Sequence, residues 1–147
     1  MNPDYRDMLS ALSAENVEFL VVGAYALAVH GLPRATGDID VWIRPTPENA
    51  ERAFRALKRF GAPLHDLTSL DFSREGTVFQ IGVAPRRIDL LTAIDAVSFD
   101  EAWPERASVT VGALAVPVIG RAALIKNKKA TGRTRDLADA EQLELID

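Results

Sequence analysis

Hydrophobic and polar positions follow two different periods along the chain, and these periods predict a mixture of helices and strands. Residues 3–15 repeat apolar positions at helical spacing, at Tyr5, Met8, Leu9 and Leu12. A run of apolar and β-branched residues from 17 to 24 is too short for a helix of its own and predicts a strand that Gly23 ends. Residues 24–31 then predict a short helix that Gly31 closes.

The stretch GDIDVWI, residues 37–43, alternates with the period of a strand. Successive side chains of a strand point to opposite faces of the sheet. One face therefore carries Ile39, Val41 and Ile43, and the other carries Asp38, Asp40 and Trp42. The sequence thus predicts two carboxylates on the same face of one strand.

The rest of the chain continues this alternation of helices and strands. Residues 46–60 predict a helix with Thr46 as its N-cap and Gly61 just past its end. Strands are predicted at 77–83 and 86–92, a hairpin at 108–119, and helices at 121–130 and 133–146. We therefore expect one α+β domain over residues 1–147, with a short mixed sheet, helices packed against it and a helical C-terminus.

Composition and charge narrow the classes of function. The 147 residues include no cysteine, so disulfides, thiolate chemistry and a cysteine zinc site are excluded, and only two histidines are present. A formal net charge of -4 makes the whole molecule a poor electrostatic attractor of nucleic acid. Neither a signal sequence nor a membrane-spanning apolar run is apparent, so we expect a cytoplasmic protein without a membrane partner.

Asp38 and Asp40 raise a question of charge, because two carboxylates on one strand face repel each other. Either one carboxylate stays protonated or a cation lies between them. A third acid, Asp89, occupies a matching position in RRIDLL and would converge with the pair if the two strands were neighbours. Mg²⁺ prefers such oxygen ligands and keeps positions open for water and phosphate. The alternative is an ordinary solvated polar face.

The segment before these acids adds a candidate phosphate site. A strand runs into a glycine turn that opens a helix, and a helix start offers unpaired backbone N–H groups to an anion. Together, VVGAYALAVHGLPRATGDIDVWI and RIDLL resemble the nucleotidyltransferase superfamily that includes DNA polymerase β. Gly23, Asp38, Asp40 and Asp89 match its motif positions. The tail KNKKATGRTRDLADAEQL resembles the abortive-infection and toxin–antitoxin branch.

The resemblance implies transfer of a nucleoside monophosphate from a nucleoside triphosphate to an unidentified acceptor, which is a small molecule, an RNA or a protein. Asp38, Asp40 and Asp89 would be the catalytic residues and would hold Mg²⁺. Besides Gly23, the nucleotide-binding candidates are Ala24, Arg34, Lys128 and Arg133. Arg34 could instead balance Asp38, and lysines of this tail could belong to a solvated helix face.

Ala24 departs from the motif, where serine or glycine is usual. Alanine has no hydroxyl to offer a phosphate, so only backbone N–H groups could serve there. This departure keeps a second hypothesis open, a catalytically silent module that binds nucleotide, RNA or a toxin partner. A third is a purely structural domain whose acids are solvated.

Overall fold

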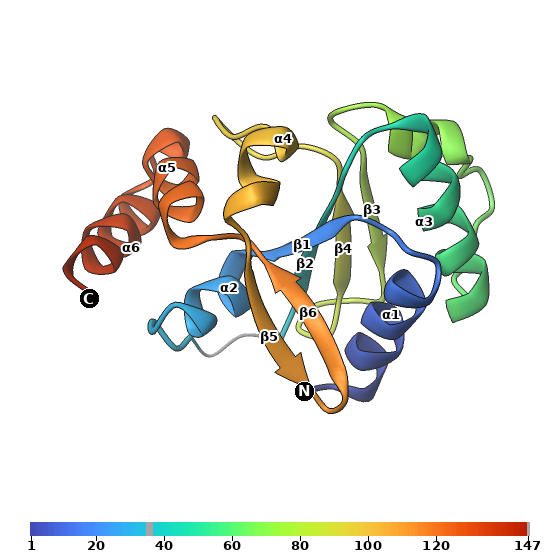
Figure 1. Ribbon diagram of the computed structural model, residues 1–147, viewed down its shortest axis with the longest axis horizontal. Helices are drawn as coiled ribbons and strands as arrows, with labels where there is room; N and C mark the ends of the chain where they lie inside the picture. The colour runs from blue at the N-terminus through green and yellow to red at the C-terminus, as the bar shows by residue number, and fades with distance from the viewer. Residues whose placement is uncertain (35–36, 147) are drawn as a thin grey trace.

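The computed structural model describes residues 1–34 and 37–146. Its centre is a six-stranded mixed sheet (Figure 1). In spatial order the strands are β3 (Val78–Ile81), β4 (Ile88–Leu91), β2 (Ile39–Ile43), β1 (Phe19–Val22), β6 (Leu114–Val118) and β5 (Ala107–Val111). The order differs from the chain order, so strands that are distant in sequence become neighbours.

Strand β2 lies between β1, which runs antiparallel to it, and β4, which runs parallel to it. The register places Asp40 opposite Asp89 on β4 and opposite Val22 on β1. The pairs β3–β4 and β5–β6 are antiparallel, whereas β1 and β6 are parallel. The predicted α+β class with a short mixed sheet is therefore confirmed.

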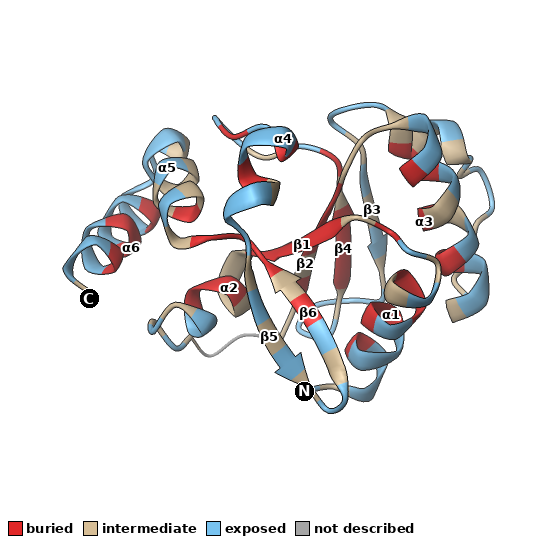
Figure 2. Ribbon diagram, in the orientation of Figure 1, coloured by how far each residue is buried: buried red, intermediate tan, exposed pale blue. Residues whose placement is uncertain are grey.

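Helices α1 (Pro3–Ala14) and α3 (Pro47–Phe60) pack against each other. The side chain of Asn2 caps α1, and α3 begins with a proline in its first turn, where no intrahelical N–H is needed. Gly61 ends α3 with φ +92°, a left-handed conformation that glycine adopts without strain. Figure 2 shows buried residues along β1, β2 and β4 and along one side of each of these helices, which form the core.

The C-terminal part of the chain is a helical hairpin beyond the β5–β6 pair. Helices α5 (Arg121–Thr131) and α6 (Thr134–Leu145) pack against each other, and Gly132 between them has φ +71°. They lie at the end of the molecule opposite α3 (Figure 1). The guanidinium of Arg121 donates to the carbonyl of Leu143, which ties the start of α5 to the end of α6.

The structure differs from the sequence prediction at several short elements. Strand β1 ends at Val22, because Gly23 and Ala24 already belong to α2 (Gly23–Val29). Unpredicted turns of helix are η1 (Ser69–Ser73), α4 (Phe99–Ala102) and η2 (Trp103–Glu105). Ser98 and Glu101 cap α4 reciprocally, and their spacing of three residues in the sequence is the signature of this capping box. Among the described helices, none is long and apolar enough to cross a bilayer.

Candidate active site

The three candidate acids come together on β2 and β4. Asp40 and Asp89 are direct neighbours because these strands run parallel in that register. Asp38 immediately precedes β2, and its Oδ1 accepts a hydrogen bond of 2.9 Å from the backbone N–H of Arg87, just before β4. Asp89 is 8% exposed, and Asp40 is half-buried. The structure therefore brings together the acids that the sequence marked.

Position 23 requires glycine because it lies against the side chain of Asp40. It opens α2 with φ +70°, a conformation that other residues adopt only with strain. A Cβ at this position would overlap Oδ2 of Asp40. The missing side chain thus lets the turn after β1 lie directly against the acidic strand, and Gly23 and Ala24 line the same cleft as Asp40.

Arg87 is the cation of this acidic cluster, and sequence reasoning missed it. Its Nε donates to Oδ1 of Asp89 at 2.7 Å, and its Nη2 donates to Oδ2 of Asp89 at 3.1 Å. The same Nη2 lies 3.5 Å from Oδ2 of Asp38. Arg87 lies one residue before β4 and two residues before Asp89, so the alternation of an extended chain puts both side chains on the same side. This spacing in RRIDLL was the signal that could have identified the pair.

Asp40 bears the electrostatic cost of the cluster. Burial raises the pKa of its carboxyl, and the adjacent charges and hydrogen bonding of Asp89, followed by the charge of Asp38, raise it further. Arg87 acts in the opposite direction, but the net effect brings the pKa of Asp40 to about 6. Like charges in a partly buried place resist joint ionisation. At neutral pH a cation bound beside Asp40 would therefore stabilise its ionised carboxylate.

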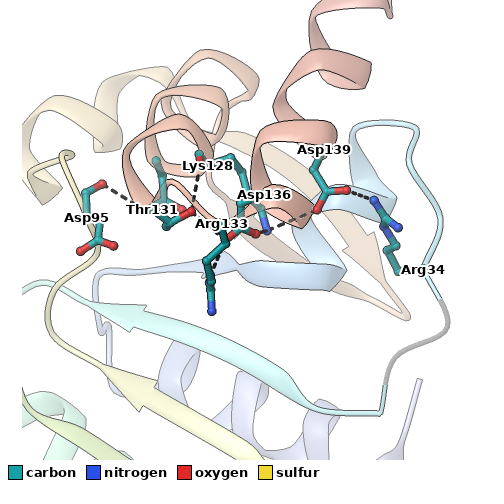
Figure 3. Close-up of polar contacts among 8 residues, drawn as sticks. Arg34, Asp95, Lys128, Thr131, Arg133, Asp136 and Asp139 are labelled. Atoms are coloured by element: carbon teal, nitrogen blue, oxygen red, sulfur yellow. Dashed lines mark hydrogen bonds and ion pairs between the residues drawn. The ribbon is translucent and has the colours of Figure 1, made fainter.

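The α5–α6 hairpin supplies a wall of cations and buried acids (Figure 3). Lys128 Nζ donates to Oδ1 of Asp136 at 3.0 Å and lies 3.7 Å from Oδ2 of Asp139. Thr131 and Arg133 both donate to Oδ2 of Asp136, at 2.7 and 2.6 Å. Asp136 and Asp139 are both buried. Lys128 and Arg133 are thus ion-paired within the protein.

Arg34 is distant in sequence from α5 and α6 but contacts the same wall. It lies in the segment that leads toward β2, and its Nη2 forms an ion pair with Oδ1 of Asp139. The alternative that Arg34 balances Asp38 gains no support from this contact. One cleft of about 670 Å³ is lined by all the candidate residues: Gly23, Ala24, Arg34, Asp38, Asp40, Asp89, Lys128 and Arg133.

The acids of the cleft can be matched to the ligand preferences of Mg²⁺. Across the chain apart from residues 35–36 and 147, no three Asp, Glu or His side chains form a preformed metal centre. Mg²⁺ commonly binds through one or two carboxylates, with waters and substrate phosphates completing its shell. The neighbouring carboxylates of Asp40 and Asp89, with the raised pKa of Asp40, fit that mode of binding.

The fold of this chain is similar to that of several solved structures. The chain superposes on a putative nucleotidyltransferase from Thermotoga maritima with a TM-score of 0.58 at 17% identity, covering 99% of this chain and 93% of the other. This chain has the nucleotidyltransferase fold. The lincosamide antibiotic adenylyltransferase LnuA, solved with lincomycin, has a TM-score of 0.61 at 12% identity and covers 100% and 98% of the two chains.

A third structure of the nucleotidyltransferase fold is ANT(2″)-Ia in complex with adenylyl-2″-tobramycin. It has a TM-score of 0.59 at 15% identity, over 97% of this chain and 91% of the other. At such identities the likeness concerns the fold. No protein-family model matches the chain, and no curated protein matches its sequence. The fold that the resemblance implies is therefore confirmed, whereas the toxin–antitoxin branch stays a prediction.

Proposed function

We propose that the protein transfers a nucleoside monophosphate from a nucleoside triphosphate to a hydroxyl-bearing acceptor and releases pyrophosphate. The observation that carries the proposal is the single cleft in which Asp40 and Asp89, in register on parallel strands, share the lining with Arg34 and Lys128. One substrate would meet both groups. The acids suit the metal that accompanies a triphosphate, and the cations suit its phosphates.

The three acids would hold Mg²⁺ through Asp38 and Asp40, with Asp89 completing a second metal position or taking the acceptor proton. Bound there, Mg²⁺ would neutralise charge on the entering and leaving oxygens of an in-line displacement. The new bond joins the acceptor oxygen to the α-phosphorus, and the bond from this phosphorus to the pyrophosphate oxygen breaks. The acceptor loses its proton to a carboxylate, and the pyrophosphate leaves with the bond electrons.

The remaining cleft residues would bind and orient the nucleotide. Gly23 allows the backbone at the start of α2 to approach Asp40, and the N-cap of this helix provides no side-chain hydrogen bond to its first turn. Ala24 contributes backbone N–H only. Arg34, Lys128 and Arg133 would face the phosphates from the opposite wall, where they are already oriented by Asp136 and Asp139.

Small hydroxyl compounds are the acceptor class to test first. The neighbouring structures include an adenylyltransferase of a lincosamide antibiotic and a complex with an adenylylated aminoglycoside. The alignments cover 98% and 91% of the chains of these two neighbours. These neighbours support a search with lincomycin and tobramycin as probe acceptors, each incubated with ATP and Mg²⁺ and analysed by mass spectrometry for an added monophosphate.

The proposal is tested by calorimetric titration of ATP, GTP, CTP and UTP, with and without Mg²⁺. We expect binding of at least one triphosphate that depends on Mg²⁺ and is lost in Asp40→Asn. Asp66→Asn is the matched control, because Asp66 is exposed outside the cleft and undergoes the same chemical change. Failure of every triphosphate to bind the wild-type protein, or full binding by Asp40→Asn, would refute the proposal.

A catalytically silent nucleotide-binding module is the second candidate. Two observations favour it: Ala24 stands where the motif has serine or glycine, and Arg87 already bonds both carboxylate oxygens of Asp89. This candidate predicts metal-dependent nucleotide binding without transfer to water, lincomycin, tobramycin, RNA or a protein partner. Release of pyrophosphate in the presence of any acceptor would decide for the enzyme.

A further inference from the structure

Asp139 occupies an unusual position between two cations from separate parts of the chain. Its side chain is 2% exposed. Oδ1 pairs with Arg34, which precedes β2, and Oδ2 lies 3.7 Å from Lys128 on α5 (Figure 3). One carboxylate on α6 thus links the α5–α6 hairpin to the segment that leads to the acidic strand.

Burial explains why this carboxylate orders its partners. An ionised carboxylate away from water is costly unless cations and hydrogen bonds compensate it. Asp136 uses Lys128, Thr131 and Arg133 for this purpose, whereas Asp139 depends on Arg34 and the more distant Lys128. Displacing either cation would leave a buried charge, so both cations are held in place at the cleft wall.

We propose that Asp139 is a positioning residue that sets Arg34 and Lys128 together as the phosphate-binding wall of the cleft. This inference rests on the proposed function, and it identifies which carboxylate builds the basic wall. Asp139 acts through the two cations and leaves the reacting atoms to the acids of β2 and β4.

The two cations retain donors for a substrate. The side chain of Arg34 is 29% exposed and lines the cleft, so its ion pair with Asp139 leaves it at the cleft surface. Lys128 has three N–H donors on one ammonium, and within the described part of the chain two acids, Asp136 and Asp139, lie within ion-pair distance of it. Arginine and lysine placed in this way complement the non-bridging oxygens of a polyphosphate.

The test compares the affinities of variants for ATP and for AMP, measured by calorimetry with Mg²⁺. We expect Asp139→Asn to weaken ATP binding about tenfold, corresponding to about 1.4 kcal/mol, and to change AMP binding by less than about twofold. Asp139→Glu should restore part of the loss because it restores the charge. Glu144→Gln is the matched control, since it removes the exposed Lys129–Glu144 ion pair between the same two helices and lies outside the cleft.

A folding defect is separated from positioning in two ways. Circular dichroism and urea unfolding show whether Asp139→Asn keeps the folded hairpin, and a general loss of fold would weaken AMP as much as ATP. The double variant Arg34→Gln, Asp139→Asn provides the second measurement. If Asp139 acts through Arg34, the loss in the double variant is smaller than the product of the two single losses.

Each outcome decides one of the two proposals. Equal ATP affinity in Asp139→Asn and Glu144→Gln overturns the positioning role, as does a loss that is the same for AMP and ATP. Independent, multiplicative losses in the double variant also overturn it. If the wild-type protein binds no triphosphate, the proposed function fails, and the positioning role fails with it. Selective ATP loss with partial rescue by Asp139→Glu supports both.

Discussion

Replacement of Asp40 by asparagine should make the protein more stable at neutral pH while removing its proposed metal site. The pKa of Asp40 rises from 3.8 to about 6, through burial first and then through Asp89 and Asp38. Two pKa units correspond to about 3 kcal/mol, and partial exposure to solvent reduces this to about 2 kcal/mol. Asparagine keeps the shape and removes the repelling charge. We therefore expect a gain of about 2 kcal/mol in the free energy of unfolding.

The gain should depend on pH in a defined direction. Between pH 3.8 and about 6 the folded wild-type protein retains the Asp40 proton that the unfolded chain releases. Stability of the wild type therefore falls as pH rises through this window, because the folded state binds more protons. Asp40→Asn has no carboxyl at this position, so its stability does not fall in this way. The difference between the two proteins should be near zero below the window and complete above it.

Urea unfolding in EDTA at several pH values, followed by circular dichroism, measures this difference. In a thermal scan at pH 7.5, the melting temperature of the variant should be about 4 to 8 °C above that of the wild type. Asp66→Asn, an exposed substitution, should differ little at any pH. Added Mg²⁺ should then stabilise the wild type and leave Asp40→Asn unchanged, because a ligand stabilises only the state that binds it. A variant that is no more stable than the wild type at pH 7.5, or a pH-independent difference, would refute the reasoning.

Three further substitutions test other parts of the cleft. Arg87→Gln removes the hydrogen bonds to Asp89, so the protein should lose stability in EDTA at neutral pH and gain more in melting temperature from Mg²⁺ than the wild type does. Gly23→Ala should cost about 1–3 kcal/mol in urea unfolding, since φ is +70° and the new Cβ meets Asp40. Asp136→Asn should lower stability above pH 4. Burial raises the pKa of Asp136, but its hydrogen bonds lower it to about 2, so the deficit should shrink as pH falls from 3.8 to 2 in acid unfolding.

Periodicity predicted most of the fold because local patterns determine which face of each element is buried. Helix α3 began after Thr46 and ended before Gly61, as predicted, and β5 and β6 formed where the hairpin over 108–119 was predicted. Strand order is another matter. It depends on contacts between distant segments, which no local period encodes, so the placement of β4 beside β2 came only with the structure.

The acidic half of the site was predictable for the same reason. Asp38 and Asp40 share a face by strand geometry, and Asp89 occupies an equivalent position on its own strand. The partners of the cations were not predictable. Arg34 and Asp139 are far apart in sequence, and their pairing requires the α5–α6 hairpin to fold back beside the segment before β2. The sequence left two roles open for Arg34, a contact with the phosphates or balance of Asp38, and it indicated no pairing with Asp139.

Each wall of the cleft contains both acids and cations, an arrangement that would let an acidic protein bind a polyanion together with its metal ion. Asp38 and Asp89 face Arg87, and Asp139 faces Arg34 and Lys128. A bare triphosphate would approach one wall of carboxylates, and a bare metal ion would approach one wall of cations. In a metal–triphosphate complex, the metal would face the carboxylates of β2 and β4, and the phosphates would face Arg34 and Lys128. Metal and nucleotide should therefore strengthen each other's binding by the same factor, because coupling between two ligands is reciprocal.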